Sequence, residues 1–156
     1  METYYVGGLF VPGVKYLELD FKVGIINYQA YVSSNSDKSI VPYPIFEEWR
    51  YLTDIKINQK GPSFTLFDLY GNHQYEQIYP CASLELNFGC ANFETEFVVV
   101  KNACKPMLGL DFQKKNGLCM VHTGNNGRNS KWVFQMENSP NVLKLKEKIM
   151  KTPTEY

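Results

Sequence analysis

Residues 84–100 read LELNFGCANFETEFVVV, and this stretch decides the fold class. Polar and apolar side chains alternate along 84–88, which is the period of a half-buried β-strand. Turn-forming residues follow at 89–92, and a run rich in phenylalanine and valine returns at 93–100. Two such runs around a short turn are typical of an antiparallel hairpin. The stretch therefore predicts a β-hairpin at the centre of a β-rich domain.

Working outward, the same signals recur on both sides of this hairpin. Further strands are predicted at 16–32 (a hairpin turning near Gly24), 39–41, 64–70, 74–79, 118–122 and 131–134. Two short helices are predicted at 44–49, where Pro44 suits the first turn, and at 111–117, where Asp111 can cap and Gly117 can end the helix. Many short strands with few helices predict an all-β barrel.

The C-terminal segment has a different pattern. Residues 138–140 read Asn-Ser-Pro, a helix-start signal, and Val142, Leu145 and Ile149 recur at helical spacing. We expect an amphipathic C-terminal helix within 138–156, whose apolar side chains are a candidate docking element for another protein. Its lysines are better interpreted as a solvated helix face than as a nucleic-acid site. The predicted organisation is an extension at 1–13, a barrel at 14–137 and this tail.

Composition restricts the function classes. The 156 residues carry 16 Lys+Arg against 16 Asp+Glu, which argues against a surface built to bind a phosphate backbone. Aromatic residues make up 15% of the chain, too many for a disordered protein. The sequence has neither an apolar run long enough to span a bilayer nor a basic, apolar start typical of a signal peptide. We expect an intracellular domain, cytoplasmic or nuclear, with no membrane partner.

The cysteines and histidines do not suggest a metal or cofactor site. The four cysteines, at 81, 90, 104 and 119, include no closely spaced pair of the kind that structural zinc sites use. We interpret them as reduced thiols. His73 and His122 are isolated, and neither fits a nucleophile–histidine–acid arrangement. No cofactor and no metal are expected.

Two stretches together resemble a known family. Residues 107–117, MLGLDFQKKNG, resemble the helix near the end of retroviral and retrotransposon aspartic proteases. Residues 30–41, AYVSSNSDKSIV, resemble the active-site strand of the same retropepsin-like family. The order and separation of these stretches, and the predicted hairpins between them, also follow the family over residues 14–135. The resemblance implies a small acid-protease barrel of retroelement origin that forms a two-fold homodimer.

The chain departs from the family at the catalytic residues. Where the family has Asp-Thr-Gly, this chain has Ser33, Ser34 and Asn35, and the nearest acid is Asp37. The family's chemistry needs a carboxylate from each subunit, one acting as base and one as acid. A serine hydroxyl near neutral pH performs neither role without an adjacent base. The resemblance therefore implies a degenerate active-site loop and a domain that does not hydrolyse peptides.

The resemblance also suggests what remains. Ser34 keeps the hydroxyl that joins the two loops across the family's dimer axis, and Asn35 tolerates the backbone conformation of the glycine it replaces. The predicted flap tip is Tyr70, Gly71 and Asn72, with a single glycine. We expect a homodimerisation and protein-interaction scaffold whose partners are itself and another protein.

Two other functions fit the same resemblance. The chain is an active aspartic endopeptidase if Asp37 serves as the acid, or if an aspartate-bearing subunit completes a heterodimer. Alternatively, the former substrate cleft is a peptide-binding groove, since an extended peptide can add to a sheet without being cut. In that case Asp37 contacts the peptide.

Overall fold

A computed structural model describes residues 2–5, 15–34, 36–60, 64–67, 77–101, 103, 105–123, 131–137, 139 and 141–149. The predicted hairpin at its centre is confirmed as strands β7 (Gln77–Asn87) and β8 (Asn92–Val100), paired from Asn87 and Asn92 at the turn to Gln77 and Val100. Gly89 in the turn has φ +90, a conformation that favours glycine.

The predicted hairpin at 16–32 is also confirmed. It consists of β2 (Lys15–Val23) and β3 (Ile26–Val32), which pair from Val23 and Ile26 at the turn to Leu17 and Val32. Gly24 has φ +60, and a Cβ there would lie 2.9 Å from the backbone oxygen of Leu52. The turn therefore needs glycine for both its conformation and its close contact with the end of a helix.

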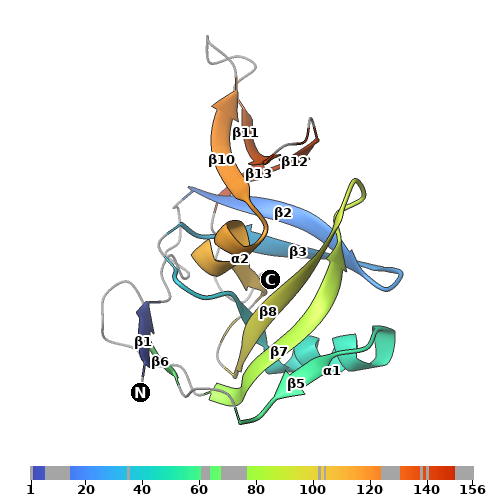
Figure 1. Ribbon diagram of the computed structural model, residues 1–156, viewed down its shortest axis with the longest axis vertical. Helices are drawn as coiled ribbons and strands as arrows, with labels where there is room; N and C mark the ends of the chain where they lie inside the picture. The colour runs from blue at the N-terminus through green and yellow to red at the C-terminus, as the bar shows by residue number, and fades with distance from the viewer. Residues whose placement is uncertain are drawn as a thin grey trace.

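The main sheet has eight strands in the order β13-β2-β3-β9-β4-β8-β7-β5 (Figure 1). Four of them are short: β4 (Ile40–Pro42), β5 (Lys56–Asn58), β9 (Met107–Leu108) and β13 (Lys146–Ile149). A second sheet pairs β1 (Glu2–Tyr5) with β6 (Phe64–Phe67) in parallel. A third has the order β10 (Leu118–Thr123), β11 (Lys131–Met136), β12 (Val142–Lys144).

Both predicted short helices are present among the described residues. α1 (Tyr43–Leu52) has Pro44 in its first turn, and Phe46 and Trp49 are buried. α2 (Leu110–Lys115) begins after Gly109 and is followed by Gly117 at φ +60. Asp111 lies inside the first turn of α2 and does not cap it, contrary to the prediction, because the N-cap residue is Gly109. No described helix is long and apolar enough to cross a membrane.

Aromatic side chains fill the core between the sheets and the helices. Trp49 contacts the rings of Phe21, Tyr28 and Phe97. Phe112 of α2 contacts Phe134 of β11 at a ring-centroid distance of 6.3 Å. Each buried aromatic side chain removes a large apolar area from water, and this burial is the main term that stabilises the fold. The β-rich class predicted from the sequence is confirmed.

The predicted C-terminal helix is wrong. Residues 142–144 and 146–149 form β12 and β13, which pair with β11 and β2 respectively. Leu143 and Leu145 are buried while Lys144 between them is exposed, the alternation of a strand. The helical spacing of Val142, Leu145 and Ile149 is therefore coincidental: Leu145 belongs to the core, whereas Val142 and Ile149 are 40% and 61% exposed.

Other predictions can be only partly compared with the structure. The expected hairpin between 64–70 and 74–79 contains residues outside the described part of the chain, including the predicted flap tip of Tyr70, Gly71 and Asn72. Within the described part, β6 pairs with β1 and not with β7. The strands predicted at 118–122 and 131–134 are confirmed as the antiparallel pair β10 and β11.

Candidate functional site

The two stretches that carry the family resemblance meet in the structure. Strand β9 lies between β3 and β4, parallel to the first and antiparallel to the second. Its residue Leu108 pairs with Val32, where β3 ends, and Met107 pairs with Ile40, where β4 begins. The loop 33–39 therefore connects β3 to β4, and β9 lies between these two strands. We call this loop together with residues 106–111 the loop–helix junction.

Backbone hydrogen bonds fix the two halves of the junction together. The Ser33 amide donates to the Leu108 carbonyl at 3.0 Å, and the Leu110 amide donates to the Ser36 carbonyl at 2.8 Å. Between them, Gly109 fits where no side chain can: a Cβ there would lie 2.7 Å from the backbone oxygens of both Ser36 and Lys38. The glycine of the second stretch thus allows the loop and α2 to approach this closely.

A buried serine and a carboxylate complete the junction. The Ser39 side chain is fully buried; its hydroxyl donates to Asp111 Oδ1 at 2.8 Å and its amide donates to Asp111 Oδ2 at 3.1 Å. The Gly109 amide donates to the same Ser39 hydroxyl oxygen at 3.0 Å. Burial raises the pKa of Asp111, although the hydrogen bonds from Ser39 and Phe112 and the charge of Lys38 oppose this. Asp111 therefore acts as an acceptor that holds the loop.

The structure separates the predicted loop residues. Ser33 is 7% exposed, whereas Ser34 and Asp37 are exposed, and Asn35 lies outside the described residues. Ser36, which follows, is fully buried and donates from its hydroxyl to the Lys38 carbonyl at 2.8 Å. Residues 33–36 present hydroxyl and amide groups but no carboxylate. Asp37, which comes next in the loop, is exposed at the surface, and Asp111 of the junction is hydrogen-bonded to Ser39.

Lys38 extends the junction toward the small β1–β6 sheet. Its ammonium lies 4.6 Å from the ring centre of Tyr4 and 5.4 Å from that of Phe64, within the range of cation–π attraction. Lys38 also lines a cavity of about 170 Å³ with charges of both signs. The other charged residues of that cavity are Glu94, Glu96, Asp111 and Lys115.

One thiol lies close to these charges. The buried Cys81 thiol donates to Glu96 Oε1 at 3.3 Å. Burial, followed by the charge of Glu96 and its hydrogen bond, raises the pKa of Cys81 to about 12. The thiolate is the reactive form of cysteine, so this thiol stays protonated and unreactive at neutral pH. The described residues hold no group of three or more His, Cys, Asp or Glu side chains placed to bind a metal ion.

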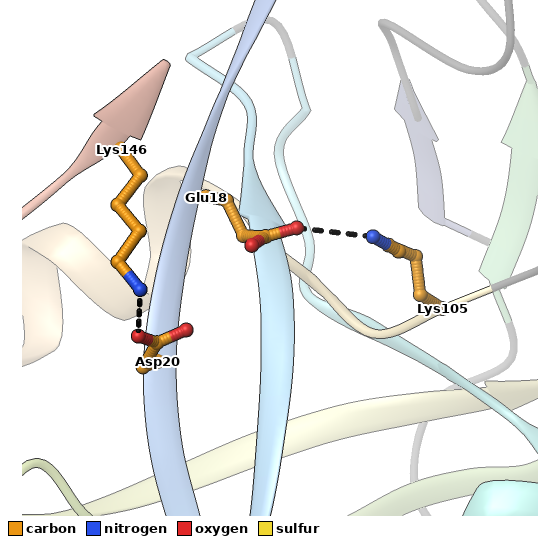
Figure 2. Close-up of polar contacts among 4 residues, drawn as sticks. All are labelled: Glu18, Asp20, Lys105 and Lys146. Atoms are coloured by element: carbon orange, nitrogen blue, oxygen red, sulfur yellow. Dashed lines mark hydrogen bonds and ion pairs between the residues drawn. The ribbon is translucent and has the colours of Figure 1, made fainter. Parts of the chain in front are cut away.

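An ion pair anchors the approach to the junction. Lys105 Nζ lies 3.1 Å from Glu18 Oε2, and the two side chains are only 18% and 9% exposed (Figure 2). Burial lowers the pKa of Lys105, but the hydrogen bond and charge of Glu18, with a contribution from Tyr16, outweigh it and raise the pKa overall. The pair joins β2 to the segment that leads into β9. The second pair in Figure 2, Asp20 with Lys146, joins β2 to β13 and is largely exposed.

Local sequence patterns did not reveal these structural partners. Asp111 and Ser39 are 72 positions apart, and Glu18 and Lys105 are 87 apart, so only the fold brings them together. The available signal was that Ser39 and Asp111 each lie within one of the two motif stretches. The predicted docking residues Val142, Leu145 and Ile149 do not form one face, because Leu145 is buried and lies between two short strands.

Comparison with known proteins adds no family assignment: no protein-family model matches the chain, and no curated protein matches it.

Proposed function

We propose that this chain is a catalytically inactive, retropepsin-like domain that homodimerises and serves as a protein-interaction scaffold derived from a retroelement. One observation carries the proposal: the loop 33–39 is held in place by β9 and α2, yet residues 33–36 contain no carboxylate. The two stretches that resemble the family are far apart in the sequence and lie side by side in the fold. This juxtaposition supports the origin of both stretches from a retropepsin-like domain.

The chemistry of the loop supports the absence of peptide hydrolysis. Aspartic proteolysis requires two carboxylates that share a proton, of which one acts as the base and the other as the acid. At the corresponding position each copy of this chain offers the Ser33 hydroxyl group, which stays protonated and cannot act as the general base. Asp111 accepts hydrogen bonds from Ser39 and is therefore committed to the loop's structure.

The replaced residues also favour association. In the family, two carboxylates face each other across the dimer axis, and like charges at a buried interface are costly unless they share a proton. A dimer built with Ser33 in that place avoids the repulsion at neutral pH. Selection for self-association without catalysis accounts for a loop that keeps its hydrogen bonds while losing its acids.

Two measurements test the proposal together. Light scattering at tens of micromolar protein should give the mass of a dimer, and incubation with an unstructured protein between pH 4 and pH 7 should give no cleavage that pepstatin inhibits. A strict monomer would remove the scaffold proposal, and pepstatin-sensitive cleavage would replace it with the active endopeptidase.

A variant sharpens this test at the loop itself. Ser33→Asp restores a carboxylate, so the variant should dimerise less at pH 7 than at pH 4, whereas the parent protein should not show this difference. Asn27→Asp is the matched control, because it adds the same charge at an exposed position of β3, the strand that leads into Ser33. Equal dimerisation of the two variants at both pH values would contradict a two-fold axis beside Ser33.

A further inference from the structure

Gln113 of α2 is a buried polar side chain whose amide nitrogen is unpaired. Only 8% of the residue is exposed, and its Nε2 is buried without a hydrogen-bond partner in the described part of the chain. Buried side-chain amides are normally hydrogen-bonded, because a donor that leaves water without gaining an acceptor costs free energy. An exception of this kind in a folded protein therefore needs a physical reason.

Gln113 also lines a surface cavity of about 410 Å³. The cavity lies where the C-terminal end of α2 meets the first residues of β10 and the last residues of β11, and Figure 1 shows α2 at the base of β10. Leu118 and Met136, which pair across these two strands, contribute apolar lining. A cavity of this volume suits a small organic molecule, whereas a single ion or water would leave most of it empty.

The charges of the described lining residues balance. The lining has one lysine, Lys114, and one acid, Glu137, and both residues are exposed. Its other polar side chains are uncharged: the amides of Gln113 and Gln135 and the thiol of Cys119. A lining with no net charge offers little electrostatic attraction to a phosphate group or a divalent cation. The cavity therefore suits a neutral ligand that is recognised by hydrogen bonds.

The chemistry of the glutamine side chain restricts the ligand further. A side-chain amide carries a donor and an acceptor next to each other. Its last torsion is broad and two-fold, so a half-turn exchanges Nε2 and Oε1 and brings either atom towards the cavity. A ligand group with its own adjacent donor and acceptor can satisfy both atoms of the Gln113 amide. A ligand with only an acceptor can satisfy only one of them.

We propose that this cavity binds a small neutral ligand through a carboxamide or lactam edge, which pairs with the side-chain amide of Gln113. The apolar body of the ligand packs against Leu118 and Met136, and the ligand supplies the acceptor that Nε2 lacks in the chain itself. The unpaired amide then costs stability in the free protein and contributes affinity in the complex. The cavity lies outside the loop–helix junction, and the inference does not depend on the proposed homodimer.

Nicotinamide is a suitable probe, because it joins a primary carboxamide to a flat ring. In NMR titrations it should shift the side-chain NH₂ signals of Gln113 and the backbone amide signals of Leu118 and Cys119, with a dissociation constant in roughly the millimolar range expected of so small a ligand. 3-Acetylpyridine has a methyl group in place of the NH₂ and should bind roughly fivefold more weakly, because it lacks the donor. No shift with nicotinamide at tens of millimolar, or equal affinity for both probes, would overturn the proposal.

A substitution at Gln113 separates binding from stability. Gln113→Leu removes the amide at similar volume, so the affinity for nicotinamide should fall roughly tenfold, while urea unfolding should show no loss of stability because no bond within the chain is broken. Gln29→Leu, at an exposed position of β3, is the matched control and should change neither property. If Gln113→Leu destabilises the protein or leaves the affinity unchanged, the amide has a structural role and the proposal is wrong.

Cys119 reports occupancy of the cavity independently. Saturating nicotinamide should slow the reaction of the Cys119 thiol with N-ethylmaleimide several-fold, because Cys119 lines the cavity. Cys90, which is exposed in the turn between β7 and β8, should react at an unchanged rate, and peptide mass spectrometry distinguishes the two sites. If nicotinamide leaves the rate at Cys119 unchanged, the probe binds elsewhere and the cavity is not the site.

Discussion

The loop–helix junction and the C-terminal strands β10–β13 use their polar groups in opposite ways. In the junction, the buried Ser39 donates hydrogen bonds to the half-buried Asp111, and both groups belong to the same chain. In the C-terminal strands, the described lysines Lys144, Lys146 and Lys148 are exposed. The polar groups of the first region fix its shape, whereas those of the second face water. Substitutions in the junction should therefore change the free energy of unfolding more than substitutions of these exposed side chains.

Two ion pairs on β2 show the same difference at the scale of single side chains. Glu18 with Lys105 joins β2 to the approach to the junction and is mostly buried, whereas Asp20 with Lys146 joins β2 to β13 in solvent (Figure 2). The exposed pair is the closer one, at 2.5 Å against 3.1 Å. Solvent screens an exposed pair strongly, so its shorter distance does not make it the more stabilising.

The largest effect is expected at Gly109. Gly109→Ala places a Cβ against two backbone oxygens that cannot move without displacing the loop 33–39. We expect the free energy of unfolding to fall by about 3 kcal/mol, at the upper end of overpacking costs. Urea unfolding followed by circular dichroism measures this change.

Gly89→Ala is the control for this substitution. Its Cβ has no neighbour within 4 Å, so only the positive φ opposes the alanine, at a cost of roughly 1 kcal/mol. If both variants lose the same stability, the close packing at Gly109 does not hold the junction.

The next largest effect is expected at Asp111. Asp111→Ala leaves the buried Ser39 amide and hydroxyl without their acceptor and should lower the free energy of unfolding by about 2 kcal/mol. Asp54→Ala, which removes an exposed carboxylate beyond the end of α1, should change it by less than about 0.5 kcal/mol. Similar unfolding midpoints for the two variants would show that Asp111 is not a structural acceptor.

The sequence predicted the parts of the fold whose signals are local. The hairpins at 16–32 and 84–100 follow from alternation over neighbouring residues and from glycine turns. The segment 142–149 carries two patterns at once: helical spacing through Val142 and Leu145, and alternation through Leu143 and Leu145. Pairing with β11 and β2, which are distant in the sequence, selects the strand. Tertiary contacts of this kind override local propensity.

The candidate site was predictable only in its location. The two motif stretches identified the loop 33–39 and residues 107–117, but not how they touch. Local patterns gave Asp111 a capping role, whereas its main partner is Ser39, 72 positions away. Neither periodicity nor composition predicts the contact between Ser39 and Asp111, because this contact depends on β9 lying between β3 and β4.

A smaller effect is expected at the ion pair beside the junction. Lys105→Met leaves the Glu18 carboxylate poorly solvated and should lower the free energy of unfolding by about 1–2 kcal/mol, less than for a fully buried pair because Lys105 is partly exposed. Lys146→Met removes the exposed pair and should have no measurable effect. If both variants lose the same free energy of unfolding, the ion pair beside the junction is no more stabilising than the exposed pair on β13.

The pH dependence of the Lys105 variant adds an independent check. The folded pKa of Lys105 is raised above its unfolded value, so the stability it contributes is fully present below the unfolded pKa and is lost as pH rises through the folded one. The difference between the parent protein and Lys105→Met should therefore be constant from pH 7 to pH 9 and shrink at higher pH. If the difference in stability between the parent protein and Lys105→Met grows as the pH rises, the ion pair between Lys105 and Glu18 does not stabilise the fold.

The smallest effect is expected at Lys38, which links the junction to the β1–β6 sheet. Its ammonium contacts the rings of Tyr4 and Phe64, and Lys38→Met should cost about 0.5–1 kcal/mol, whereas Lys38→Arg keeps a cation over the rings. A two-stranded sheet is marginal by itself, so the loss should appear first in β6. Hydrogen exchange should quicken at Leu66 and stay unchanged at Phe97 of β8. Quicker exchange in both strands would mean that Lys38 stabilises the whole fold and not the β1–β6 sheet in particular.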